Sequence, residues 1–218
     1  MAITFPIPVA DYFAGLRIAS ASIYLPEAME ISQTGGGEIL TADLGARLWR
    51  GSASMVPGLV ADVAAAEARL SVLRQSGRSF FACPVGNAYP RADPDGSILG
   101  VSAPVIASLA ANNRELTISG LPIGYVLSAG DFLSFSYGAD PVRYAFHQVV
   151  VGSTADALGI TGQIEVTPHI RPGAAVAAAV TLIRPAFKAV VIPGSYAAAM
   201  IGPRIASGQA FQFQQTLR

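Results

Sequence analysis

Three consecutive glycines are the first feature of this 218-residue sequence that could support chemistry, because glycine-rich loops bind phosphate groups. A Walker loop needs Gly-x-x-x-x-Gly-Lys followed by Ser or Thr, and a dinucleotide loop needs Gly-x-Gly-x-x-Gly between a strand and a helix. Gly35, Gly36 and Gly37 are adjacent, no lysine follows them, and the next segment has the pattern of a strand. We therefore interpret them as the flexible turn of a hairpin between Ile31 and Ile39.

Histidine and cysteine are scarce, which limits nucleophilic and metal chemistry. The chain has two histidines, His147 and His169, and one cysteine, Cys83. Structural zinc sites take four ligands, and a Ser/His/Asp triad needs a nucleophile, for which the Gly-x-Ser-x-Gly elbow is lacking. By residue type, either histidine can act as a general base. We interpret His147 as a sheet-face residue, His169 as a loop residue and Cys83 as a small buried hydrophobe.

The 14 carboxylates are thinly spread, and the nearest approach to clusters is Asp93 with Asp95 and Asp131 with Asp140. The segment 93–96 (DPDG) has the composition of a turn in which aspartate accepts hydrogen bonds from its own backbone. It lacks the ligand spacing of a calcium loop. A carboxylate pair for glycoside hydrolysis stays open, because a sequence gives no separations in space. We predict that the protein is not an enzyme and has no catalytic, cofactor-binding or metal-binding residues.

The composition indicates surfaces that are buried against partner subunits. Hydrophobic residues make up 52% of the chain and charged residues only 13%, against about a quarter in ordinary globular proteins, although much of the apolar fraction is alanine. The net charge is zero and no stripe of Lys and Arg is present, so nothing attracts nucleic acid by charge alone, and we expect no sequence-specific contact with nucleic acid. We expect no membrane span and, because the N-terminus lacks the features of a signal peptide, folding in the cytoplasm.

Most of the chain has the pattern of β-strands, and one segment has the pattern of a helix. Apolar residues alternate with small or polar ones, and Gly or Pro interrupts roughly every eight to twelve residues. Residues 18–24 and 46–54 are candidate strands. Residues 57–76 are predicted to form a helix, with Pro57 in its first turn and Gly77 just beyond its end. The apolar face of this helix comprises Leu59, Val63, Ala66, Leu70 and Leu73.

A loop rich in Pro and Asx residues at 87–96 indicates a boundary, after which strands follow one another with almost no helical period. Such a series of strands is typical of a small closed or nearly closed barrel. The alternating segment near residue 218 is predicted to return to the first sheet. We therefore predict a mainly β (α+β) fold. It comprises a β-sandwich domain at 1–98 with the helix 57–76, completed by residues 194–218, and an inserted OB-like β-barrel at 99–193.

Two sets of short motifs follow one another along the chain. The first contains the Gly-Gly-Gly loop, a Leu-Trp strand, the helix and a Gly-Arg-x-Phe strand, within residues 35–81. The second contains Ala-Gly-Asp-Phe at 129–132 and Val-Thr-Pro at 166–168. This order resembles the distal tail protein family of long, flexible-tailed bacteriophages. The first half is similar to the ring-forming domain of that family, and the second half to a small barrel common in phage tail components.

The resemblance implies a structural protein of the virion. Members of the family assemble as a hexameric ring that joins the tail tube to the hub and the receptor-binding apparatus, in the baseplate at the tail tip. The implied partners are further copies in a homo-oligomeric ring, the tail tube protein, and the tail hub and fibre proteins. Assembly would occur in the host cytoplasm, and the family has no active site. On this interpretation Gly35, Gly36 and Gly37 adapt at a ring interface or at the lumen, and Trp49 anchors the sandwich core beneath the helix.

Two alternatives stay open. In the first, the inserted barrel is a carbohydrate-binding module for host attachment, and Tyr125, Tyr137 and Tyr144 stack on sugar rings. Aromatic residues on alternating strands are, however, also common in barrel cores. In the second, the chain is a tail-tube subunit, which would form long polymers instead of a closed ring.

Overall fold

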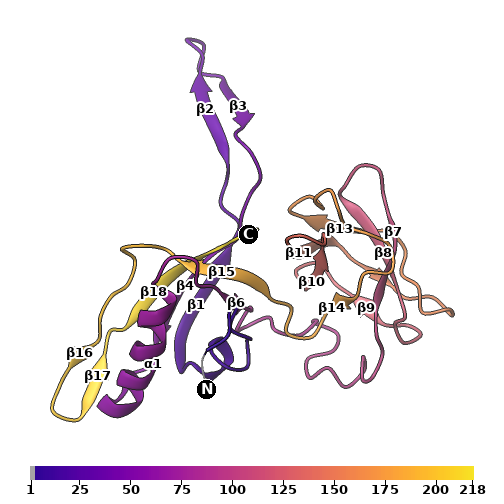
Figure 1. Ribbon diagram of the computed structural model, residues 1–218. Coiled ribbons are helices and arrows are strands. Elements are labelled where there is room, and N and C mark those ends of the chain that lie inside the picture. Colours follow the sequence, from indigo (N-terminus) through magenta and orange to yellow (C-terminus); the bar gives the residue numbers. More distant parts are fainter. Residues whose placement is uncertain (1–2) are drawn as a thin grey trace.

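The computed structural model describes residues 3–218 and shows a mainly β fold with one α-helix in that range, as the sequence predicts (Figure 1). A five-stranded antiparallel sheet forms the first half of the molecule. Its strands lie in the order β1 (Ile18–Tyr24), β4 (Arg50–Met55), β18 (Ala210–Gln215), β15 (Phe187–Val191) and β6 (Phe80–Ala82). The strand predicted at 18–24 is confirmed, and the one predicted at 46–54 begins later, at Arg50.

The contact between β18 and β4 depends on the alternation of β18 and on one glycine. Phe211, Phe213 and Gln215 of β18 are buried, and the residues between them are less buried. Phe213 pairs with Gly51 of β4, and its ring occupies the space that a Cβ at Gly51 would need. Glycine at this position therefore lets the aromatic ring approach the backbone of β4.

An aromatic cluster fills the first hydrophobic core. The centroid of the fully buried Phe80 ring lies 5.4 Å from that of Tyr12, 6.0 Å from that of Phe13 and 5.8 Å from that of Phe213. Most of these pairs are edge to face, an arrangement that aromatic quadrupoles favour. Burial of such large side chains supplies much of the hydrophobic stabilisation of this half.

The helix α1 (Val60–Leu73) covers this core and is shorter than the predicted 57–76. Its buried residues are Val63, Leu70 and Leu73. Pro57 precedes the helix and does not occupy its first turn, because β5 (Gly58–Leu59) pairs with β17 (Ile205–Ser207) as a short strand. Gly77 has a φ of +76°, so its left-handed conformation is as predicted, but the helix ends at Leu73 with Arg74 as its C-cap, and Gly77 lies in the turn that follows.

A six-stranded antiparallel sheet forms the second half and curves into a nearly closed barrel. Its strands lie in the order β14 (Val180–Thr181), β10 (Phe132–Tyr137), β11 (Arg143–Val151), β13 (Ile164–Thr167), β8 (Glu115–Ser119) and β7 (Val105–Leu109). A bridge from Val105 to Ala179 joins the two outer strands. The short strands β9 (Val126–Leu127) and β12 (Ser153–Thr154) pair with each other, and a second buried cluster fills the barrel.

The sheet pairing departs from the predicted segments at one strand. The predicted barrel segment 99–193 includes β15, but β15 pairs with β18 and β6 in the first sheet. In this register Ala189 lies opposite Gln215, and Lys188 lies opposite Phe81. The alternation of a strand does not say which sheet it joins, because only its pairing partners decide that. The division of the chain into a ring domain and an inserted domain stays a prediction.

Two small sheets extend from the first half of the molecule. β2 (Met29–Gln33) and β3 (Ile39–Asp43) form an antiparallel hairpin around the glycine run, as predicted. β16 (Met200–Ile201), β17 and β5 form a three-stranded sheet. In Figure 1 the hairpin projects from one end of the first sheet, and β16 and β17 lie beside α1 toward the opposite end. Within residues 3–218, no helix is both long enough and apolar enough to cross a membrane.

Candidate functional site

The β2–β3 hairpin is the candidate functional site, and the glycine run forms its tip. Thr34 N donates to Glu38 O at 2.9 Å, and Thr34 Oγ1 accepts from Glu38 N at 3.1 Å. Gly37 has a φ of +85°, a conformation that favours glycine, and its N–H donates to Thr34 O at 2.9 Å. A Cβ added at Gly35 would meet no atom within 4 Å, and one at Gly36 would meet only Thr34 Oγ1. Gly37 is therefore needed for the turn, and the other two glycines keep its tip free of side chains.

The hairpin has one apolar face. Ile31 pairs with Thr41, and the register places Met29, Ile31 and Ile39 on the same side of the two strands. Leu40 lies on the opposite side, among small and polar residues. Every residue of both strands is solvent-exposed, and Ile31 and Ile39 are 61% and 63% exposed. The apolar face is therefore uncovered by the chain described here.

Main-chain and side-chain hydrogen bonds connect the two chain segments that form the stem of the hairpin. Arg47 Nη2 donates to Leu25 O at 3.0 Å, and Arg47 Nε donates to Pro26 O at 3.2 Å. Leu44 N donates to Ala28 O at 2.8 Å, which continues the ladder toward the stem. These contacts hold the two strands together at the point where they leave the body of the molecule.

Apart from Arg47 in the stem, the charged residues of the hairpin region are all acidic. Between residues 18 and 46 the sequence has no Lys or Arg, and its acidic residues are Glu27, Glu30, Glu38 and Asp43. An isolated two-stranded hairpin is marginally stable at best in water, and contiguous exposed apolar surface marks interaction sites. The arrangement is suited to bind a partner with an apolar surface bordered by positive charge.

A second exposed apolar face lies on β16, β17 and β5. Ile205 pairs with Leu59, and Met200 pairs with Ser207, so Leu59, Met200 and Ile205 share one face. These three residues are more than half exposed, whereas Ala206 on the opposite face is buried. This face was not predicted, because Leu59 lies far along the chain from the other two residues. The Gly-Pro-Arg turn between two short apolar runs is the sequence signal that indicates the hairpin of β16 and β17.

The three tyrosines predicted as possible sugar-stacking residues do not form a shared exposed surface. Tyr125 and Tyr137 lie in the barrel core, at 2% and 5% exposure. The Tyr125 hydroxyl donates to Asp93 Oδ2 at 3.2 Å, and burial raises the pKa of Tyr125. Tyr144 is half-buried, and its ring packs edge-on against that of Phe81, 4.7 Å between centroids. The two buried rings are out of reach of a sugar.

The aspartates of the 93–96 turn accept hydrogen bonds from the nearby backbone, as predicted. Asp93 is buried, and its carboxylate accepts from Ile98 N at 3.1 Å and from Leu99 N at 3.0 Å. Asp95 Oδ1 accepts from Ser97 N at 3.1 Å, and hydrogen bonds from the side chain and backbone of Ser97 lower the pKa of Asp95. These carboxylates therefore order the loop that leads into the barrel.

Asp131 orders the same region from the barrel side, and it does not form a cluster with Asp140. Its Oδ1 accepts from Arg91 N and its Oδ2 accepts from Ser128 N, both at 2.8 Å. Asp131 is buried, whereas Asp140 is exposed in the turn that follows β10. The two carboxylates therefore have different surroundings.

The two histidines have the structural positions that the sequence predicts. His147 of β11 is buried, its Nδ1 donates to Pro168 O at 2.8 Å, and its ring stacks on Phe135 with centroids 5.4 Å apart. Burial lowers the pKa of His147 to about 4, so the imidazole is neutral at pH 7. His169 lies in a loop, and its Nε2 accepts from Arg114 Nε at 2.8 Å.

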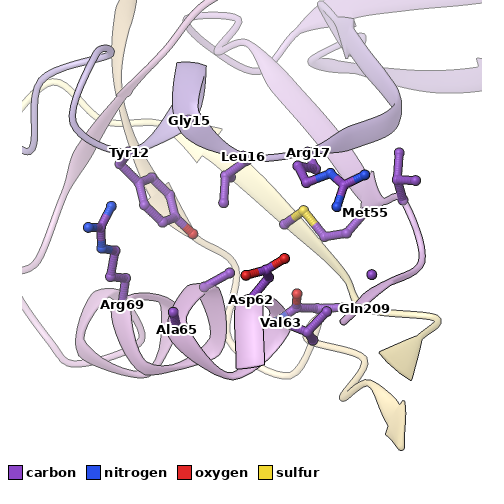
Figure 2. Close-up of a pocket in the computed structure, with 13 residues that line it drawn as sticks. Tyr12, Gly15, Leu16, Arg17, Met55, Asp62, Val63, Ala65, Arg69 and Gln209 are labelled. Atoms are coloured by element: carbon purple, nitrogen blue, oxygen red, sulfur yellow. The ribbon is translucent and has the colours of Figure 1, made fainter. Parts of the chain in front are cut away.

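Figure 2 shows a cavity of about 330 Å³ between α1 and the segment that contains the 3-10 helix η1 (Phe13–Gly15). Leu16 and Val63 contribute apolar lining, and the charged lining residues are Arg17, Asp62 and Arg69. The Tyr12 hydroxyl is buried in its wall and has no hydrogen-bond partner among residues 3–218. The lining residues include no Ser, Cys or His, and we assign no reaction to this cavity.

Trp49 belongs to the first core, in the same buried cluster as Leu70 and Leu73 of the helix, and it also packs on the barrel. Its Nε1 donates to Phe146 O at 2.8 Å, and its ring packs edge to face on the rings of Phe132 and Phe146, at 5.8 and 5.2 Å. Both phenylalanines belong to barrel strands but are buried in the first core. The residue is core, as expected, and the partner it packs on is the barrel.

Cys83 is buried, and burial raises the pKa of its thiol, in agreement with its interpretation as a small hydrophobe. Among residues 3–218, the His, Cys, Asp and Glu side chains form no group of three that could hold a metal ion. No protein-family model matches the chain, and no curated protein matches it.

Proposed function

We propose that this protein is a structural subunit of a bacteriophage tail tip. It forms a ring that connects the tail tube to the hub and the receptor-binding apparatus, and its role is assembly without catalysis or a cofactor. Two observations support the proposal. The short motifs resemble the distal tail protein family, in which the ring is hexameric, and an arm with a bare apolar face projects from the body.

The observation that carries the proposal is the uncovered face of the β2–β3 hairpin. Apolar surface in water costs about 25 cal/mol per Å², and burial against another chain recovers this free energy. Ile31 and Ile39 are both more than half exposed on an ordered pair of strands. A monomer gains no stability from such an arm, whereas a ring subunit gains an interface from it.

The composition agrees with this role. Charged residues make up 13% of the chain, and the cores of subunit interfaces are depleted in charge. A ring subunit has neighbours on two sides, so that a large share of its surface is buried in the assembly.

The experiment that tests the proposal is a mass measurement of the purified protein by light scattering, with negative-stain images of the same sample. We expect closed rings. Long tubes would favour the tail-tube alternative. A monomer at every accessible concentration would contradict self-assembly of the chain.

A variant that lacks the β2–β3 hairpin tests whether this element is required for assembly. Leu44 N donates to Ala28 O at 2.8 Å, so residues 29–43 can be replaced by a two-residue Gly-Gly turn without separating the ends of the stem. We expect this variant to be monomeric, with the thermal stability of the remaining fold unchanged.

A further inference from the structure

We propose that the ring contact is head to tail. The apolar face of the β2–β3 hairpin of one copy packs on the exposed face formed by Leu59, Met200 and Ile205 of the next copy. This inference rests on the proposed function, because it names the two surfaces that meet in the ring.

The two faces match in size and character. The hairpin presents Met29, Ile31 and Ile39, and the three-stranded sheet presents three large apolar side chains from three adjacent strands. Exposure is high on both: 63% at Ile39 of the hairpin, and 73% at Met200 of the sheet. Two pleated surfaces of this kind interdigitate when they pack face to face.

The two faces cannot meet within one copy. The hairpin projects from one end of the first sheet, and β16 and β17 lie at the other end (Figure 1). Different surfaces on opposite ends of the same chain make a heterologous contact, which forms a ring when the rotation closes. A second copy of this chain is therefore the occupant that the geometry favours.

The charges of the two regions are complementary. Residues 18–46, which include the hairpin, have four carboxylates and no Lys or Arg. Residues 193–209, which include β16 and β17, have no carboxylate and one basic residue, Arg204. Arg204 is exposed in the turn directly before Ile205, at the border of the apolar face. Opposite charges at the border of an interface favour the correct partner and accelerate association.

Four single substitutions and one mixture test the contact. Ile31→Asp places a carboxylate on the hairpin face, and Ile205→Asp places one on the sheet face. Leu40→Asp and Ile201→Asp introduce the same charge at positions that are also more than half exposed, on the opposite faces of the same two small sheets. We expect the first two to weaken association roughly a hundredfold, and the two controls to assemble as the wild type does.

The mixture distinguishes head-to-tail contact from any symmetric arrangement. The Ile31→Asp chain keeps an intact sheet face, and the Ile205→Asp chain keeps an intact hairpin. Each is expected to be monomeric alone, and an equimolar mixture is expected to form dimers and nothing larger, because one productive contact remains.

The results distinguish a failure of this inference from a failure of the proposed function. Wild-type rings that persist in the Ile31→Asp and Ile205→Asp variants would overturn this inference and leave the proposed ring function standing. Monomeric variants whose mixture stays monomeric would also overturn it. A wild-type chain that is monomeric and complementary variants that do not associate would overturn both.

Discussion

Trp49 donates a hydrogen bond from its indole Nε1 to the carbonyl oxygen of Phe146 at 2.8 Å, and the two rings pack edge to face. Trp49 directly precedes β4 of the first sheet, and Phe146 lies in β11 of the barrel. Gln215 Nε2 also donates to Tyr144 O, at 3.3 Å, beside this contact. A buried polar and aromatic contact thus fixes the barrel against the sheet.

We expect Trp49→Phe to lower the free energy of unfolding by roughly 1–3 kcal/mol, because the buried carbonyl of Phe146 loses its donor. Urea denaturation followed by far-UV circular dichroism measures this, since the substitution removes the sole tryptophan. Tyr24→Phe, at an exposed position, is the control and should change the value by less than about 0.5 kcal/mol. Equal stabilities of the Trp49 variant and the wild type would show that the contact contributes nothing.

We expect Gly51→Ala to destabilise the first sheet by roughly 1–3 kcal/mol, because the added methyl group overlaps the ring of Phe213 and the backbone oxygen of Ser22. Gly35→Ala is the matched control, since a Cβ there meets no neighbour and the backbone has no positive φ. Thermal unfolding of both variants measures the difference. A similar melting temperature for the two would contradict the packing of Phe213 on β4.

We expect the free energy of unfolding to decrease as the pH is lowered, in part because of His147. The folded pKa is about 4 and the ordinary value is 6.5, so the unfolded state binds more protons between these values. The contribution is fully present above pH 6.5 and is lost as the pH falls toward 4. It amounts to about 3 kcal/mol at 1.36 kcal/mol per pH unit.

His147→Asn removes the titrating group and retains a donor for Pro168 O. Unfolding free energies at pH 7.5, 5.5 and 4.5 should therefore depend less on pH in this variant than in the wild type. Leu158→Ala, at an exposed position and without a titratable group, serves as the control and should retain the wild-type slope. The same slope in all three proteins would exclude a neutral buried imidazole.

We expect a disulfide between copies when Ile39→Cys and Ile205→Cys chains are mixed and oxidised with diamide, because the proposed contact brings these two faces together. The native Cys83 is buried and does not compete. Non-reducing gels show the covalent dimer. Leu40→Cys in place of Ile39→Cys should give little product, and comparable yields from both would argue against the predicted orientation of the hairpin.

Several elements were predictable because their signals are local. The alternation of 18–24 gives β1, and the glycine run between two apolar strands gives the β2–β3 hairpin. Gly77 marks the left-handed turn beyond α1. Each of these features depends on neighbours within a few residues, for which residue type and spacing are sufficient.

Other features depend on partners that lie far along the chain. The helix begins at Val60 and not at Pro57, because β5 pairs with β17, and the partner of Trp49 is in the barrel. The strand β15 alternates like a barrel strand but joins the first sheet. The exposure of the hairpin could not be predicted from the sequence either. Alternation shows that one face of a strand is apolar, but it does not show whether another segment covers that face.

Strands leave the ribosome in chain order, so strands that are neighbours in the first sheet are synthesised at different times. β4 pairs with β18, and the whole barrel is synthesised between them, which takes roughly ten to thirty seconds at ordinary translation rates. The barrel strands β7 and β8, and β10 and β11, pair with their neighbours in the chain and can fold during that interval. β5 can pair only after β17 has been synthesised. The β2–β3 hairpin of a nascent chain is therefore complete long before the sheet face of β16, β17 and β5, which is its proposed partner. If the proposed contact forms, the receiving face of a chain is complete only after synthesis has passed Ser207.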